Sequence, residues 1–156
     1  MEARPLTLRD KQTVCGWHYP GRYAVYDLPS WEEMTRRQMG FADPAQDSNY
    51  YGFWEGDALV GYVNLRPEEG GVLVGIGVDP ARCGQGLGRR MLRQAVQMAA
   101  QRWPDKRPCL VVRTWNRRAV RCYQAAGFQV EGEPFRLITP AGEGEFYRMT
   151  WNPPQE

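Results

Sequence analysis

The residues from Ile76 to Arg89 have the composition of an anion-binding turn. The segment reads Ile-Gly-Val-Asp-Pro-Ala-Arg-Cys-Gly-Gln-Gly-Leu-Gly-Arg. Glycines at positions 84, 86 and 88 allow the backbone to approach a phosphate closely. A helix that begins at the last glycine presents unpaired N–H groups and the positive end of its dipole. Arg89 and Arg90 add positive charge at the same point, so the turn predicts binding of a phosphate-bearing ligand.

Three common interpretations of such a turn are possible, and the sequence disfavours each of them. A Walker loop requires Gly-Lys-Ser/Thr, whereas Arg89 and Arg90 follow the last glycine here. A dinucleotide fingerprint requires GxGxxG in a parallel unit, but these glycines alternate and the preceding strands look antiparallel. A helix that merely follows a flexible turn is the third reading, and three alternate glycines before an arginine pair disfavour it.

The elements around the turn follow from hydrophobic periodicity. Apolar residues recur at three- and four-residue spacing over 87–102, which predicts an amphipathic helix ended by Pro104. Before the turn, short apolar runs predict an antiparallel meander with a hairpin turn at Glu55-Gly56-Asp57. The expected strands are 3–8, 50–55, 59–65, 72–78, 109–113, 128–130 and 145–151.

Two further helices are expected. Residues 116–126 form one, which Gly127 closes. Residues 30–39 form the other, with Ser30 as N-cap and Glu33 completing a capping box, whereas the rest of 10–48 reads as irregular. The order of strands and helices predicts an α/β fold, in which helices pack on a mixed, mostly antiparallel sheet.

Charge is distributed unevenly along the 156 residues. The chain has 20 Lys and Arg against 18 Asp and Glu, a net charge of +2. Residues 80–122 hold eleven of the cations and a single acid, Asp105, so this block carries +10 and the remainder −8. The block indicates either an anionic ligand or solvated helix faces.

Composition excludes several classes of protein. A hydrophobic content of 42% is enough to bury a core. No apolar run reaches the ~18 residues of a membrane span, and the first residues lack the apolar segment of a secretory signal, so we expect a cytoplasmic protein. The four cysteines form no CxxC pair and one histidine accompanies them, so no metal site is expected.

The glycine-rich turn resembles the first motif of the GCN5-related N-acetyltransferases, [Gln/Arg]-x-x-Gly-x-[Gly/Ala] after a strand ending in Val-x-Pro. Val78-Asp79-Pro80 matches the strand end and Gly86-Leu87-Gly88 the glycines, whereas Cys83 replaces Gln or Arg, with Arg82 beside it. In that family the turn holds the pyrophosphate of coenzyme A mainly through backbone N–H groups. The glycines should therefore matter more than the side chain at position 83.

A second motif of this family, Asn-x-x-Ala-x-x-x-Tyr-x-x-x-Gly-Phe, is matched by Asn116, Ala119, Tyr123, Gly127 and Phe128. The Asn and Tyr are seven residues apart, so they share one face of a helix. The resemblance covers about residues 72–128. It implies a single acetyltransferase domain over 1–156, with an acceptor-side region and meander (1–70), an acetyl-CoA core (72–128) and C-terminal strands (129–156), splayed at the strands 72–78 and 109–113.

The resemblance also implies an acetyl-CoA-dependent N-acetyltransferase that uses no metal and transfers the acetyl group directly to a primary amine. Backbone N–H groups near Gly77 and Val78 would polarise the thioester carbonyl. Tyr123 would act as general acid, because a phenol with a reference pKa of about 10 can protonate a thiolate whose thiol has one of about 8.5. The expected coenzyme-binding residues are Ile76, Gly77, Val78, Cys83, Gly84, Gln85, Gly86, Leu87, Gly88, Arg89, Asn116 and Tyr123.

Asn116 and Tyr123 also have purely structural readings, as a helix N-cap and as an aromatic residue packed on the sheet. The general base is not identified by any motif. Many members of the family carry a Glu on the strand before the turn, but residues 72–78 contain no acid. Relatives that acetylate ribosomal N-termini carry a Glu at the position of Val111, which disfavours that substrate. Water-relayed deprotonation and the acids Asp47, Glu143 and Glu145 remain as candidates.

Aromatic residues are dense in the N-terminal third, where the acceptor is expected. They serve either as core or as a pocket for a cationic, amine-bearing acceptor, small molecule or peptide. They include Trp17, Tyr19, Tyr23, Tyr26, Trp31, Tyr50, Tyr51, Phe53 and Trp54, with His18 expected to be structural. A non-catalytic acyl-CoA binder is the alternative function. Nucleic acid and membrane partners are not expected, and a homodimer is an expected assembly because dimers are common in the family.

Overall fold

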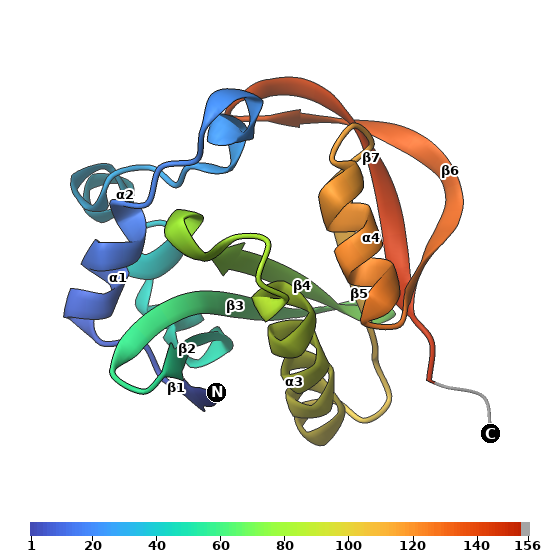
Figure 1. Ribbon diagram of the computed structural model, residues 1–156, viewed down its shortest axis with the longest axis horizontal. Helices are drawn as coiled ribbons and strands as arrows, with labels where there is room; N and C mark the ends of the chain where they lie inside the picture. Colours follow the sequence, from blue (N-terminus) through green and yellow to red (C-terminus); the bar gives the residue numbers. More distant parts are fainter. Residues whose placement is uncertain (154–156) are drawn as a thin grey trace. The chain divides into compact units, whose positions relative to one another are not determined.

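A computed structural model describes residues 1–153 (Figure 1). The seven strands are hydrogen-bonded in the order β1-β2-β3-β4-β5-β7-β6. The strands are β1 (Glu2–Arg4), β2 (Tyr50–Glu55), β3 (Ala58–Glu68), β4 (Gly71–Val78), β5 (Arg107–Arg113), β6 (Phe128–Thr139) and β7 (Gly142–Trp151). The helices are α1 (Leu8–Cys15), α2 (Trp31–Arg37), α3 (Leu87–Arg102) and α4 (Arg117–Ala125), with short 3₁₀ turns η1 (Gly21–Tyr26), η2 (Gly40–Ala42), η3 (Pro44–Asn49) and η4 (Pro80–Arg82).

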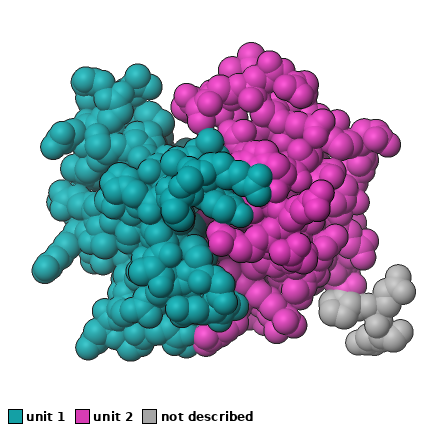
Figure 2. Space-filling model, turned by 45° about the horizontal axis from the view of Figure 1, so that its top comes forward, with its two compact units in different colours: residues 1–64, 77–87 teal, residues 65–76, 88–156 magenta. Residues whose placement is uncertain are grey.

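Two compact units divide the chain (Figure 2). Unit 1 contains residues 1–64 and 77–87, and unit 2 contains residues 65–76 and 88–156. Both β3 and β4 contribute residues to each unit. By sequence, unit 1 has seven cations against ten acids, whereas unit 2 has thirteen against eight. The uneven charge of the sequence therefore separates into a unit of net −3 and a unit of net +5.

Unit 1 packs helices α1 and α2 on the antiparallel strands β1, β2 and β3. The predicted hairpin is confirmed, because β2 pairs with β3 up to Glu55 and Ala58. Val14, Met34, Phe41 and Tyr50 form a buried cluster. The aromatic residues of this region therefore divide, and Tyr50, Phe53 and Trp54 belong to the core.

The expectation that residues 10–48 are irregular outside one helix was wrong at α1. The sequence signal for α1 is a capping box at its start. The Thr7 side chain accepts from the Asp10 N–H, and the Asp10 carboxylate accepts from the Thr7 N–H. The predicted box at Ser30 is half formed. Ser30 accepts from the Glu33 N–H, but the Glu33 carboxylate pairs with Arg36 and Arg37.

Unit 2 packs α3 and α4 with the strands β5, β6 and β7. Helix α3 has the predicted bounds, and its Met91, Leu92, Ala95 and Ala99 are fully buried. Strand β6 is much longer than predicted. Its pairing with β7 shifts register between Glu131 and Phe135, and this irregularity accommodates Gly132 and Pro134.

The sheet is mixed and mostly antiparallel, as predicted. Strands β4 and β5 are parallel, and their ladder runs from Gly71 and Arg107 to Leu73 and Cys109. This ladder ends before β4 itself ends at Val78, which agrees with strands that splay apart. Within residues 1–153, no helix is long and apolar enough to cross a membrane.

Candidate active site

The end of β4 is fixed in unit 1 by contacts on both sides of one peptide group. The Val78 carbonyl accepts a hydrogen bond from the Tyr19 hydroxyl at 2.7 Å. The following N–H, that of Asp79, donates to the Val60 carbonyl at 2.9 Å. The residues to which the sequence assigns the thioester contacts, Gly77 and Val78, therefore lead into a peptide whose orientation is set.

The turn after β4 is built from side-chain caps and left-handed glycines. Asp79 Oδ1 accepts from the Ala81 N–H at 3.0 Å and starts η4. Gly84 and Gly86 have φ of +81° and +78°, a conformation that disfavours every residue with a Cβ. A Cβ built on either glycine meets no heavy atom within 4 Å among the described residues, so both face open space. Such an open glycine pair suits a ligand that approaches the backbone.

Cys83, which stands where the family has Gln or Arg, is engaged inside the turn. Its Sγ lies 3.6 Å from the Asp79 carbonyl oxygen, and the side chain is half-buried. Gln85 is exposed, whereas Leu87 is buried and anchors the start of α3. The turn therefore presents backbone N–H groups and glycines to a ligand, and not a Gln or Arg side chain at position 83.

In unit 2, the first turn of α3 lies close enough to α4 for an electrostatic interaction. Burial raises the pKa of the Cys122 thiol above its ordinary value, and the Arg89 guanidinium partly offsets that rise. Arg89 and Arg90 are exposed. One of the predicted phosphate-binding arginines is therefore near the residue that precedes Tyr123 on α4.

Helix α4 starts at a buried N-cap. Asn116 Oδ1 accepts from the Ala119 N–H at 3.2 Å, which confirms the capping prediction. Tyr123 lies on the same helix and is half-buried. Gly127 follows the helix with φ of +103°, and a Cβ there would lie 2.9 Å from Trp151 Nε1. The role of Tyr123 as general acid stays a prediction.

The predicted coenzyme-binding residues fall in both units. Unit 1 brings together Gly77, Val78 and the turn from Cys83 to Leu87. Unit 2 contains the remaining five, which are Ile76, Gly88, Arg89, Asn116 and Tyr123. The turn leads directly along the chain into α3, so its glycines and Arg89 share one continuous segment.

The three candidate acids each have a partner within their own unit. Asp47 Oδ1 accepts from Lys11 Nζ at 2.7 Å.

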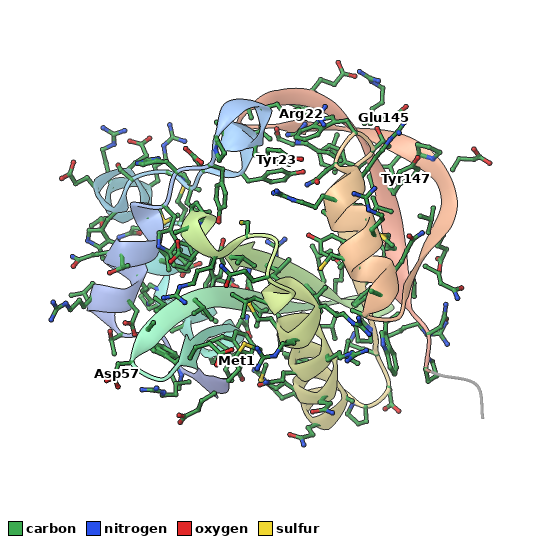
Figure 3. The ribbon with its side chains drawn as sticks, in the orientation of Figure 1. Met1, Arg22, Tyr23, Asp57, Glu145 and Tyr147 are labelled. Atoms are coloured by element: carbon green, nitrogen blue, oxygen red, sulfur yellow. The ribbon has the colours of Figure 1, made fainter. Side chains whose placement is uncertain are left out.

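Glu143 Oε1 accepts from Arg136 Nε at 2.6 Å, and Glu145 Oε1 accepts from the Thr114 hydroxyl at 2.9 Å. Figure 3 marks Glu145 and Tyr147 on β7. Val111, at the position of the ribosomal-type Glu, is exposed to 36%. Each of the three acids thus already accepts a hydrogen bond, and the general base stays unidentified.

The segment around η1 has a contact that the sequence did not predict. Tyr19 was expected in the acceptor region, but its hydroxyl binds the backbone of β4. His18 Nδ1 lies 3.0 Å from Asp27 Oδ2, and its side chain is exposed to 74%. Figure 3 shows Arg22 and Tyr23 on η1, where the Arg22 guanidinium lies 5.8 Å from the Tyr23 ring centroid. No motif connects positions 19 and 78, so only the fold could reveal this bond.

Comparison with protein families identifies the class to which the chain belongs. The acetyltransferase (GNAT) family model matches residues 12–128. The chain belongs to this family of acetyltransferases. The match includes both motifs and extends N-terminally into α1.

Curated relatives have different names and acceptors. The chain is 38% identical over 101 residues to the N-alpha-acetyltransferase RimI of Mycobacterium tuberculosis, a stretch that covers 61% of either protein. It is 36% identical over 132 residues to the spermine/spermidine N(1)-acetyltransferase of Bacillus subtilis, covering 72% of this chain and 84% of that protein. The chain thus spans about three fifths of RimI's length and most of the Bacillus enzyme's.

Solved structures share the fold. A variant of the spermidine N-acetyltransferase SpeG of Vibrio cholerae superposes with a TM-score of 0.73 at 18% identity, covering 97% of this chain and 94% of that one. The aminoglycoside acetyltransferase AAC(6')-Ib in complex with coenzyme A and kanamycin gives a TM-score of 0.70 at 20% identity, covering 95% and 93%. Identities this low establish the fold and not the acceptor.

Proposed function

We propose that this protein is an acetyl-CoA-dependent N-acetyltransferase that transfers the acetyl group directly to a primary amine in a ternary complex. The observation that carries the proposal is the turn after β4. Its two left-handed glycines face open space, and the turn continues into the N-terminus of α3 beside two arginines. This combination provides backbone donors, a helix dipole and positive charge for a pyrophosphate.

Residues of the turn, of the end of β4 and of the start of α4 would each bind a different part of acetyl-CoA. The N–H groups of residues 83–88 and the Arg89 side chain would hold the phosphates, and Asn116 would contact the coenzyme beyond its cap. The N–H groups near Gly77 and Val78 would donate to the thioester carbonyl. Because charge develops on that oxygen in the transition state, donors placed there lower the barrier.

Proton transfers complete the reaction. The amine must be neutral to attack, and a lysine-like amine is neutral in only about one molecule in 10³ at pH 7. Because β4 carries no acid, we assign this deprotonation to a chain of waters that carries the amine proton to bulk solvent. Tyr123 would protonate the departing thiolate as general acid.

A cationic amine is the acceptor class that we propose. Unit 1, which contains the N-terminal region expected to bind the acceptor, has a net charge of −3. The Bacillus relative is named for spermine and spermidine, and the AAC(6')-Ib structure holds kanamycin. Val111 replaces the acid typical of ribosomal N-terminal acetyltransferases, so we place protein N-termini second.

A non-catalytic acyl-CoA binder is the second candidate. The observation that favours it is the lack of any acid on β4, together with the partners of Asp47, Glu143 and Glu145. Such a protein would bind acetyl-CoA and release no coenzyme A in the presence of amines.

An acceptor screen tests both candidates. The purified chain is mixed with acetyl-CoA and, one at a time, spermine, spermidine, kanamycin, an alanine-terminated peptide and a neutral amine. Released thiol and acetylated product are measured together. We expect product with the polyamines or kanamycin. Turnover confined to neutral acceptors would refute the cationic class, and binding without thiol release from any amine would favour the binder.

A further inference from the structure

Tyr19 is held in place by the loop that carries it. Its backbone N–H donates to Asp27 Oδ1 at 2.8 Å, and the Asp27 N–H donates to the Ala24 carbonyl at 3.0 Å. The Tyr23 N–H donates to the Pro20 carbonyl at 3.1 Å. Residues 19–27 are therefore closed on themselves, and the half-buried phenol extends from this closed loop to the Val78 carbonyl.

A second tyrosine covers the preceding residue of β4. A Cβ built on Gly77 would clash with Tyr62 Cε1, so the ring occupies the space that any side chain at 77 would need. Burial is the main cause that raises the pKa of Tyr62 well above its ordinary value, and the nearby Tyr19 adds to the rise. Gly77 is thus packed against one ring, while the peptide after Val78 is bonded to the other.

The Tyr19 hydroxyl is a permanent donor. Burial raises its pKa far above the ordinary value of a phenol, and the nearby Cys83, Asp27 and Asp79 raise it further. The phenol therefore stays protonated over the pH range in which an acetyltransferase works. Its bond to the Val78 carbonyl does not weaken through titration.

Strand β4 is hydrogen-bonded to β3 on one edge, so the support from Tyr19 matters for its other edge. The ladder to β5 ends at Leu73, and the N–H groups near Gly77 and Val78 lie beyond it. Donors to a developing oxyanion are effective only when their orientation is fixed before the reaction. Tyr19 and Val60 hold the peptide that follows Val78. The Tyr62 ring packs against Gly77, the residue before Val78.

We infer that Tyr19 is a positioning residue, whose hydroxyl orients the end of β4 so that the Val78 N–H points at the thioester carbonyl. The inference rests on the proposed function and adds to it the residue that prepares the oxyanion donor. Tyr19 transfers no proton and does not touch the acceptor in this role. Its loss should therefore slow the chemical step and leave coenzyme binding intact.

Removal of the hydroxyl is the direct test. Tyr19→Phe keeps the ring and is expected to lower kcat by about tenfold to a hundredfold, because small misplacements of reacting groups have effects of this size. The dissociation constant for acetyl-CoA should stay within about twofold of that of the unchanged chain, because the phosphate contacts remain. Tyr50→Phe is the matched control, since it removes a hydroxyl from the core of the same unit. The control should keep its kcat.

A spectroscopic measurement separates this inference from the proposed function. A non-reactive ketone analogue of acetyl-CoA, labelled with ¹³C at the carbonyl, is bound and its carbonyl stretch recorded. In the unchanged protein the stretch should fall to lower frequency, and in Tyr19→Phe the fall should shrink. Asp27→Asn, which weakens the hold on Tyr19 without removing the hydroxyl, should give an intermediate fall.

The outcomes distinguish the positioning role of Tyr19 from the proposed acetyl transfer. An active wild-type chain with equal kcat and equal carbonyl frequency in Tyr19→Phe overturns the positioning role and leaves the proposed function standing. An analogue that binds the wild-type chain with no change in frequency overturns the oxyanion donor itself. A weaker acetyl-CoA affinity with unchanged kcat would assign Tyr19 to binding and also overturn the inference.

Discussion

The turn at residues 83–88 and helix α4 would serve the same ligand by opposite means. The turn depends on backbone shape, because Gly84 and Gly86 adopt left-handed conformations and face open space. Helix α4 depends on side chains at fixed spacing, with Asn116 at its cap and Tyr123 two turns on. The proposed function therefore predicts that Cys83 in place of Gln or Arg is tolerated in the turn, whereas a change at Tyr123 on α4 alters the chemistry itself.

The largest expected effect is on the backbone-dependent region. Gly86→Glu places a side chain at φ of +78° and brings a negative charge into the space facing the turn. We expect coenzyme A affinity to fall by about a hundredfold or more, through steric and charge conflict with the phosphates. Isothermal titration calorimetry measures it.

Gly56→Glu is the matched control. Gly56 has φ of +58° in the β2–β3 hairpin and also faces open space, so it carries the same kind of backbone strain outside the turn. Normal affinity in the control and loss in Gly86→Glu would support the turn as the phosphate site. Normal coenzyme A affinity in both variants would show that the turn does not bind the phosphates.

The next effect concerns the side-chain-dependent region. Tyr123→Phe should lower turnover by about tenfold or more, because the departing thiolate loses its proton donor. Cofactor affinity should change little. Steady-state kinetics with the best acceptor, together with calorimetry, separate the two quantities. Equal turnover would remove Tyr123 from the mechanism and return it to a packing role on α4.

Arg89 follows the turn along the chain and interacts with Cys122 of α4, and its loss should have a smaller effect. Arg89→Ala is expected to weaken coenzyme A binding by about fivefold, as one exposed charge contact contributes modestly. It should also raise the pKa of Cys122, because the guanidinium lowers it in the unchanged protein. Alkylation of Cys122 against pH measures this shift.

Arg102→Ala is the control on the same helix. Arg102 lies in the last turn of α3, with its guanidinium 4.2 Å from the Trp103 ring centroid. Coenzyme A affinity and Cys122 reactivity should both match those of the unchanged chain. Similar losses in the two variants would mean that positive charge acts generally, rather than at the first turn of α3.

The smallest effect distinguishes the two roles of Asn116. Asn116→Ala should lower the free energy of unfolding by about 1 kcal/mol through loss of the cap. Asn116→Ser keeps an oxygen acceptor and should retain most of that stability, as thermal unfolding would show. A serine variant with normal stability and weaker coenzyme binding would establish the second role. Equal binding in all three proteins would leave Asn116 as a cap alone.

Local signals predicted the elements that carry the two motifs. Helix α3 was predicted with its bounds because its apolar spacing is regular and Pro104 follows it. Strand β2 was predicted equally well because turn residues flank it. Helix α1 was missed because its eight residues are mostly polar, and its strongest signal is the box at Thr7 and Asp10.

Long-range contacts could not be read from the sequence. Tyr19 and Val78 are 59 positions apart, and nothing in either local pattern indicates their hydrogen bond. The same holds for Lys11 and Asp47, which are 36 positions apart and share a hydrogen bond. Sequence patterns report helical and strand spacing, whereas these contacts depend on how distant segments pack.

One measurement tests the central claim most directly. Acetyl-CoA labelled with ¹³C in the acetyl group is mixed with the chain and spermine, and NMR follows the label. We predict that the thioester signal is replaced by an amide signal of N-acetylated amine, with one equivalent of free thiol, and that Tyr123→Phe slows this conversion. A label that stays on the bound thioester, or that appears as acetate alone, would contradict acetyl transfer to an amine.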